Sequence, residues 1–119
     1  MPESLPPAAD LLLAACTYLE QELLPKLSGR ERFKTRVVIN VLAQVQRELE
    51  LGPALEEAES ARLKKLLADA LDGLSAQNAE LARRIRGGEI GWEDEALIEH
   101  LRQTLIGALE IDNPKWLKD

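Results

Sequence analysis

The chain has 119 residues, of which 45% are apolar and only 3% aromatic, and it carries a net charge of −6 at pH 7. A chain of this length forms one domain that buries roughly two-thirds of its unfolded surface, so we expect a single helical domain over residues 1–119. The acidic balance argues against attachment to nucleic acid or to anionic membranes, because both depend on Lys and Arg neutralising phosphates.

Apolar residues recur at three- and four-residue spacing along the whole chain, and Gly and Pro interrupt the pattern. This predicts about five helices. The expected ranges are about 7–27, 31–51, 54–72, 75–86 and a last helix from Glu93 to just before Asn113-Pro114. Leu and Ala dominate the apolar set, which favours helix packing over a sheet. The expected fold is an all-α, compact bundle of about five helices.

The second expected helix has apolar residues on two sides. Its broad apolar face consists of Phe33, Val37, Val38, Val41, Leu42, Val45 and Leu49. Ile39 and Ala43 lie nearly opposite this face at 100° per residue. Either other helices of the chain cover both sides, or the second side is open. In the open case, Ile39 and Ala43 are candidates for an interface with a partner protein or a second copy.

A basic cluster surrounds the start of the same helix, where the helix dipole already disfavours positive charge. Its members are Lys26, Arg30, Arg32, Lys34 and Arg36. Free backbone N–H groups together with Arg30, Arg32 and Arg36 would suit a phosphate or carboxylate ligand. The alternative is that Glu20 and Glu22, near the end of the preceding helix, neutralise these arginines.

Polar residues form a row between the two apolar sides of the second helix: Arg36, Asn40, Gln44 and Arg47. Side chains in this position are partly buried and need hydrogen-bond partners. The row therefore predicts either a polar pocket or a set of hydrogen bonds that fix the register between helices.

No catalytic or metal-binding pattern accompanies these features. The single histidine, His100, has Leu97 three residues before it, where a di-metal helix site would have Glu. The single cysteine, Cys16, lies on an apolar helix stripe, which indicates a buried and unreactive thiol. We therefore expect no metal and no cofactor, and we favour a role without enzymatic activity over the remaining alternative, an enzyme that uses His100 with carboxylates.

The chain resembles a family of small bacterial all-helical proteins of unknown function. The resemblance is carried by residues 6–10, 24–25, 27–30, 33, 36–37, 40–42 and 47–49 and by the closing Asp112-Asn113-Pro114-Lys115-Trp116. Genes for members of that family often stand beside those for acyl-CoA dehydrogenases and phosphotransferases of the aminoglycoside-kinase type. The resemblance implies an accessory role in acyl-CoA or hydroxy-acid catabolism, with Arg36, Asn40 and residues 112–114 as the positions expected to matter.

Two functions follow as expectations. The first is a non-catalytic accessory protein that binds a protein partner or itself through a helix face, without contacting nucleic acid or a membrane. The second is a small protein that binds an anionic metabolite of the phosphate or CoA type at Arg30, Arg32 and Arg36. Because there is one cysteine and no signal-peptide pattern, we expect a cytoplasmic location.

Overall fold

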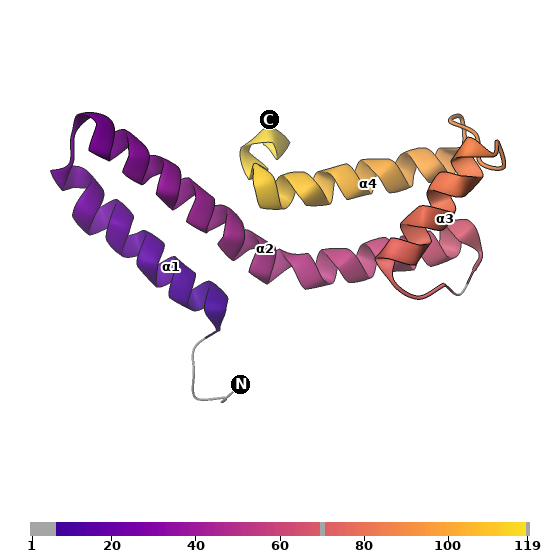
Figure 1. The fold of residues 1–119 in the computed structure, drawn as a ribbon, viewed down its shortest axis with the longest axis horizontal. Helices are drawn as coiled ribbons and strands as arrows, with labels where there is room; N and C mark the ends of the chain where they lie inside the picture. The colour runs from indigo at the N-terminus through magenta and orange to yellow at the C-terminus, as the bar shows by residue number, and fades with distance from the viewer. Residues whose placement is uncertain (1–6, 70, 119) are drawn as a thin grey trace. The chain divides into compact units, whose positions relative to one another are not determined.

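The computed structural model describes residues 7–69 and 71–118, which form helices joined by short connections, with no β-strand among them. The all-α fold class is thereby confirmed. Four α-helices account for most of the described chain: α1 Ala8–Tyr18, α2 Gly29–Leu67, α3 Leu74–Arg86 and α4 Glu95–Asp112 (Figure 1). Short π- and 3₁₀-helical segments follow α1 and α4.

The expectation of about five helices is wrong by one, because two expected helices are a single helix. α2 has 39 residues and continues through Gly52-Pro53, where the sequence predicts a stop. Proline inside a helix removes one backbone hydrogen bond, and its ring crowds the Cβ of the residue before it. Gly52 has no Cβ, so part of that crowding is absent. The missing donor and the crowding of the proline ring against the carbonyl four residues earlier remain as costs of continuing the helix.

The first expected helix, about 7–27, is not α-helical to its end. After Tyr18 the backbone forms a π-helical turn, η1 Leu19–Leu23, in which the N–H of Leu24 donates to the carbonyl of Leu19. A 3₁₀ turn, η2 Leu24–Lys26, follows. Pro25 explains the change, because it has no N–H with which to continue the α-helical pattern.

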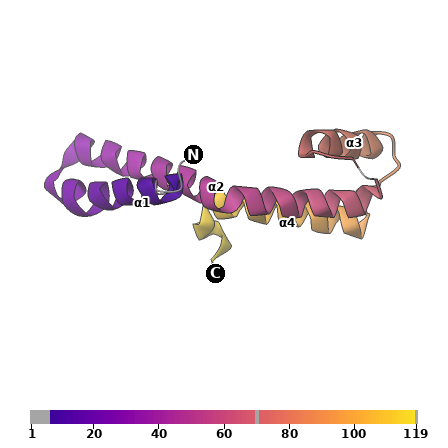
Figure 2. The same ribbon diagram turned by 90° about the horizontal axis from the view of Figure 1, so that it is seen from below.

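The described chain divides into two compact units. The first consists of the described part of Met1–Gly52 together with Ile111–Asn113. In this unit α1 and the first part of α2 form an antiparallel hairpin (Figures 1 and 2). Three apolar residues are buried there: Cys16, Leu24 and Ile39. The hairpin turn places Gly29 at a φ of 60°, a conformation that glycine adopts without strain.

The second unit consists of the described parts of Pro53–Glu110 and Pro114–Asp119. Here α4 runs alongside the later part of α2 (Figures 1 and 2), and α3 crosses the end of α2 (Figure 1) and packs against it. The buried core is made of four leucines: Leu63, Leu67, Leu81 and Leu97. Gly107 of α4 allows close approach of the two long helices, since a Cβ at this position would lie 3.2 Å from Cδ2 of Leu55.

Helix ends in this unit follow local rules. The carboxylate of Asp94 accepts a hydrogen bond of 3.0 Å from the backbone N–H of Leu97 and so caps the start of α4. At the C-terminal end of α2, Ala68 follows the last helical residue, Leu67, and has a φ of 51°. A left-handed conformation of this kind is common just after a helix and is usually occupied by glycine.

Candidate interaction surface

The arginines expected to bind an anion mostly have partners inside the first unit. The guanidinium of Arg32 donates to the carbonyl of Leu24 at 2.8 Å. The guanidinium of Arg36 lies 3.7 Å from the carboxylate of Glu20. Arg30 is exposed. The interpretation in which acidic residues of the preceding segment neutralise the cluster thus agrees with the Arg36 pair, while Arg32 instead satisfies the end of η2.

The polar row of α2 makes hydrogen bonds to the segment Ile111–Asn113. Nε2 of Gln44 donates to the carboxylate of Asp112 at 3.1 Å. Nε of Arg47 donates to the carbonyl of Ile111 at 2.7 Å. This carbonyl lies in the last turn of α4, where backbone acceptors lack partners within the helix. Asn40, the remaining member of the row, is exposed. Two of the four residues of the row, Gln44 and Arg47, thus bond to residues 111 and 112 within the first unit.

The two apolar sides of α2 differ sharply in exposure. Ile39 is only 3% exposed, and its carbonyl accepts a weak hydrogen bond from the thiol of Cys16 at 4.0 Å. Ala43 is half-buried. The side of α2 that carries Ile39 and Ala43 therefore packs against α1. The sequence pattern leaves open whether this side is covered by the chain's own helices or open to a partner. In the structure it is covered, and Ile39 is part of the intramolecular core.

The broad apolar face is the exposed one. We call its exposed members the valine face: Phe33, Val37, Val38, Val41, Val45 and Leu49. Their exposed fractions range from 40% at Val45 to 69% at Phe33. Leu42, at the margin of this face, is half-buried. Single exposed apolar residues are ordinary, whereas here six of them share one side of a single helix.

A second exposed apolar stripe lies on α4, in the other unit. It contains Ile98, Leu101 and Leu105, which are each more than half exposed. Their spacing of three and four residues places them on one side of the helix. This stripe is shorter than the valine face and offers a natural comparison for it.

The only histidine of the chain is buried and hydrogen-bonded. His100 is 4% exposed, and its Nδ1 accepts a hydrogen bond of 3.3 Å from Nε of Arg62. The same guanidinium donates to the hydroxyl of Thr104 at 3.2 Å. Burial lowers the pKa of His100 below 6.5, and the charge of Arg62 lowers it further, while Glu59 opposes the shift. These contacts favour the neutral imidazole and join α2 to α4.

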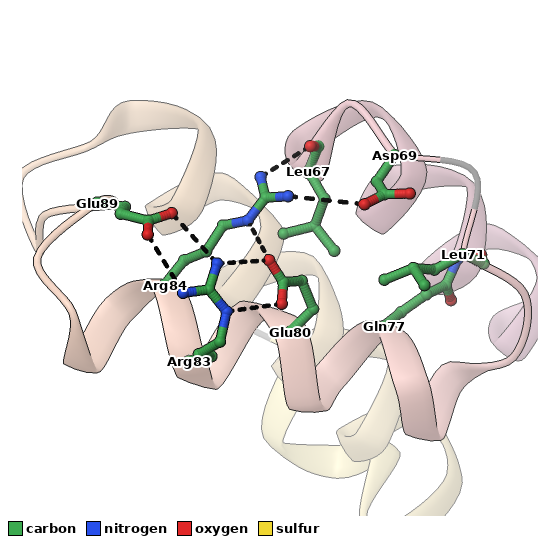
Figure 3. A network of polar contacts seen from close by, with 8 residues as sticks. All are labelled: Leu67, Asp69, Leu71, Gln77, Glu80, Arg83, Arg84 and Glu89. Carbon is green, nitrogen blue, oxygen red and sulfur yellow. Dashed lines mark hydrogen bonds and ion pairs between the residues drawn. The ribbon is translucent and has the colours of Figure 1, made fainter.

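A network of charged side chains attaches α3 to the end of α2 (Figure 3). Arg84 is its centre: it donates to the carbonyl of Leu67 at 2.8 Å and to the carboxylate of Glu80 at 2.6 Å. Asp69 lies 3.8 Å from the same guanidinium. Arg83 binds Glu80 at 2.8 Å and Glu89 at 3.2 Å.

This network lowers the pKa of Glu80. Hydrogen bonds from Arg83 and then Arg84 hold the pKa of Glu80 at about 2. The same contacts raise the pKa of Arg83 above its ordinary value. The side-chain amide of Gln77, which is fully buried, adds a hydrogen bond of 3.0 Å to the carbonyl of Leu71. The network thus joins side chains of α3 to Leu67 and Asp69 at the end of α2.

The sequence pattern does not mark Arg84 or Arg62 as residues with partners inside the protein. An arginine near the end of a helix is also expected on the surface, where it complements the helix dipole. The available signal for Arg84 was its spacing of four residues from Glu80, which favours an ion pair on a helix. No comparable signal pointed from Arg62 to His100, since they are 38 residues apart.

Among residues 7–69 and 71–118, no three potential ligands from His, Cys, Asp and Glu are grouped to hold a metal ion. No described helix combines the length and the apolar character that a membrane span requires. What the described residues do define is an all-helical protein with an extensive exposed apolar face on its longest helix.

The chain belongs to the DUF6285 family, a domain of unknown function whose model matches residues 25–116. This agrees with the resemblance to an uncharacterised family. No curated protein matches the chain, and no solved structure does so either. The matched residues include the whole of α2 and therefore the entire valine face.

Proposed function

We propose that this protein is a non-catalytic interaction module that binds a protein partner through the valine face of α2. The observation that carries the proposal is the exposure of this face, whose central residue, Val41, is 54% exposed. Five of its members, from Phe33 to Leu49, follow one another at intervals of four residues. Residues at this spacing lie side by side on a helix and can enter the grooves of another helix.

The dimensions of the valine face suit a helical partner. Phe33 and Leu49 are 16 residues apart in sequence, which corresponds to about 24 Å along the helix axis. Helices that bind in grooves commonly present a few apolar anchors over several turns, as this face does. Removing these side chains from water supplies the favourable free energy of binding.

The alternative of an anion-binding protein has less support. Arg36 is paired with Glu20, and Arg32 is bonded to the carbonyl of Leu24. A phosphate-bearing ligand would have to compete with these partners for the guanidinium groups of Arg32 and Arg36, and only Arg30 of the three is without a polar contact to another described residue. The residues of the valine face, in contrast, are exposed, so a partner can contact them directly.

The family resemblance adds a finer expectation about cellular context. It links the protein to enzymes of acyl-CoA or hydroxy-acid catabolism, for which it would act as an accessory protein. This expectation does not depend on which protein occupies the valine face.

The test compares capture of proteins by the tagged wild-type chain and by two aspartate variants. Val41→Asp places a carboxylate at the centre of the valine face, and Leu101→Asp does the same on the exposed stripe of α4. Both positions are about half exposed, so both variants should keep the helical circular dichroism of the wild type.

The proposal expects a protein that the wild type and Leu101→Asp capture and that Val41→Asp does not. Burying an unpaired carboxylate costs several kcal/mol, which is enough to abolish capture. If Val41→Asp, still folded, captures everything that the wild type captures, the valine face is not the binding surface.

A further inference from the structure

We infer that the occupant of the valine face is a second copy of this chain, bound antiparallel about a two-fold axis at Val41. The inference rests on the proposed function and names the partner for the same surface. It comes from the charges at the two ends of the face.

Lys34 and Glu48 lie on the same side of α2 as Val41, seven residues before it and seven residues after it. Seven residues make almost two full helical turns, so all three side chains leave the helix in nearly the same direction. Both charged residues are exposed. Within the described part of the chain, neither of them takes part in an ion pair.

An antiparallel copy centred on Val41 brings opposite charges together at both ends. Each residue then faces the residue equally far from Val41 on the other copy. Lys34 of one copy faces Glu48 of the other, Val37 faces Val45, and Phe33 faces Leu49. The arrangement is isologous, so one surface patch supplies both halves of the interface.

The parallel arrangement lacks this complementarity. It places Lys34 opposite Lys34 and Glu48 opposite Glu48, and like charges at an interface oppose association. A face with one basic end, an apolar centre and one acidic end is thus complementary to itself in one orientation. This property singles out a second copy from partners in general.

The side of α2 that would contact the second copy has no other described partner within the first unit. Contacts with α1 occupy the side of Ile39, and the hydrogen bonds of Gln44 and Arg47 occupy the side facing Ile111–Asn113. Val41, Lys34 and Glu48 lie on the remaining side. In the first unit, a second copy can therefore reach the valine face without displacing a described contact.

The first test measures the mass of the purified protein by sedimentation equilibrium over a range of concentrations. The wild type and Leu101→Asp should form dimers, and Val41→Asp should raise the dissociation constant by at least about 100-fold. Purified protein contains no other partner, so a wild type that stays monomeric overturns the second copy as occupant. A dimer that survives Val41→Asp in a folded chain overturns it as well.

The second test uses charge reversal. Lys34→Glu and Glu48→Lys should each weaken the dimer, because each variant faces like charges at both ends. An equimolar mixture of the two variants should associate more tightly than either one alone. Equal dimerisation by wild type, by each variant and by the mixture would overturn the charge pairing.

The third test determines orientation by cross-linking in a Cys16→Ala background. Val37→Cys and Val45→Cys should form a disulfide when the two variants are mixed, and neither should cross-link to itself. In the antiparallel register, identical positions lie about 12 Å apart along the axis, too far for a disulfide. Cross-links of 37 to 37 and 45 to 45, without 37 to 45, would show a parallel pair and overturn the register.

These experiments separate the two proposals. A monomeric purified chain that still captures another protein through Val41 overturns the second copy and leaves the interaction module standing. Loss of both dimerisation and face-dependent capture removes both proposals.

Discussion

Nε of Arg62 donates a hydrogen bond to Nδ1 of His100 across α2 and α4, at 3.3 Å. A neutral imidazole can accept at one nitrogen, whereas a protonated one can only donate. Protonation of His100 must therefore break this bond and place two positive charges side by side. Burial and the nearby guanidinium both lower the pKa of His100 for this reason.

We predict that the free energy of unfolding decreases as the pH falls from 7.5 to 5.5. His100 has an ordinary pKa of 6.5 when unfolded and a lower one when folded, so the unfolded chain binds more protons in this range. Stability associated with the neutral imidazole is complete above pH 6.5 and is lost as the pH falls through the folded pKa. Urea unfolding followed by circular dichroism at several pH values measures the slope.

The matched variant for this prediction is His100→Gln, which cannot titrate and can still accept a hydrogen bond from Arg62. His100 is the only histidine, so this variant should show a much flatter dependence between pH 5.5 and 7.5. An unchanged slope in His100→Gln would assign the effect to another group.

Asp94→Ala should destabilise the protein by about 1 kcal/mol, the usual effect of removing a side-chain cap from a helix start. The variant loses the 3.0 Å bond from the N–H of Leu97 to the Asp94 carboxylate. Glu93→Ala is the control, since Glu93 is exposed and also lies just before α4. Equal stabilities of the two variants in urea unfolding would contradict the assigned cap.

Arg84→Met should destabilise the second unit by about 1–2 kcal/mol, because the Leu67 carbonyl loses a charged donor. Arg83→Met should have a smaller effect, since Arg83 binds only exposed or partly exposed carboxylates. Thermal unfolding of both variants measures the difference. An Arg83 variant as unstable as the Arg84 variant would show that the carbonyl bond is not the main contribution.

The same Arg84 variant should raise the pKa of Glu80 from about 2, because one of its two hydrogen-bonding arginines is gone. The pKa should stay below 4.5, since Arg83 remains. NMR titration of the Glu80 side chain measures the shift. In the wild type, the contribution of Glu80 to stability is present above pH 4.5 and is lost between pH 4.5 and pH 2, well below the range in which His100 acts.

Ile39→Asp and Val41→Asp should differ strongly in their free energies of unfolding, although the residues are only two positions apart. Ile39 is 3% exposed and Val41 is 54% exposed. A carboxylate at position 39 is buried without a partner, which costs several kcal/mol of the free energy of unfolding. Circular dichroism and urea unfolding should show a strongly destabilised Ile39→Asp and a near-native Val41→Asp.

The periodicity of the sequence predicts the helical class and most helix ends, because these depend on local interactions. Glu93, Asp94 and Glu95 correctly indicate the start of α4, and Asn113-Pro114 indicates its end. At Gly52-Pro53 the same reasoning fails. Local propensity predicts a break there, but α2 continues through both residues; the missing Cβ of Gly52 removes one part of the crowding that proline causes.

Periodicity identifies both apolar sides of α2 but not which of them is buried. Burial depends on where α1 packs, and the number of apolar residues on a side does not determine that. The smaller side, with Ile39 and Ala43, is covered, and the larger side, around Val41, is exposed. The partners of Arg47 and Arg62 could not be predicted from the sequence pattern either, because these contacts join residues that are 64 and 38 positions apart.

The bond from Arg47 to the Ile111 carbonyl has a consequence for the order of folding. Cys16 and Ile39 are 23 positions apart and meet when α1 and the start of α2 form a hairpin. Arg47 and Ile111 are 64 positions apart, so their contact requires closure of a much longer loop, and long-range contacts form slowly. During synthesis, the hairpin can form while the ribosome is still adding α3, but the last turn of α4 gains its arginine donor only after Ile111 has emerged.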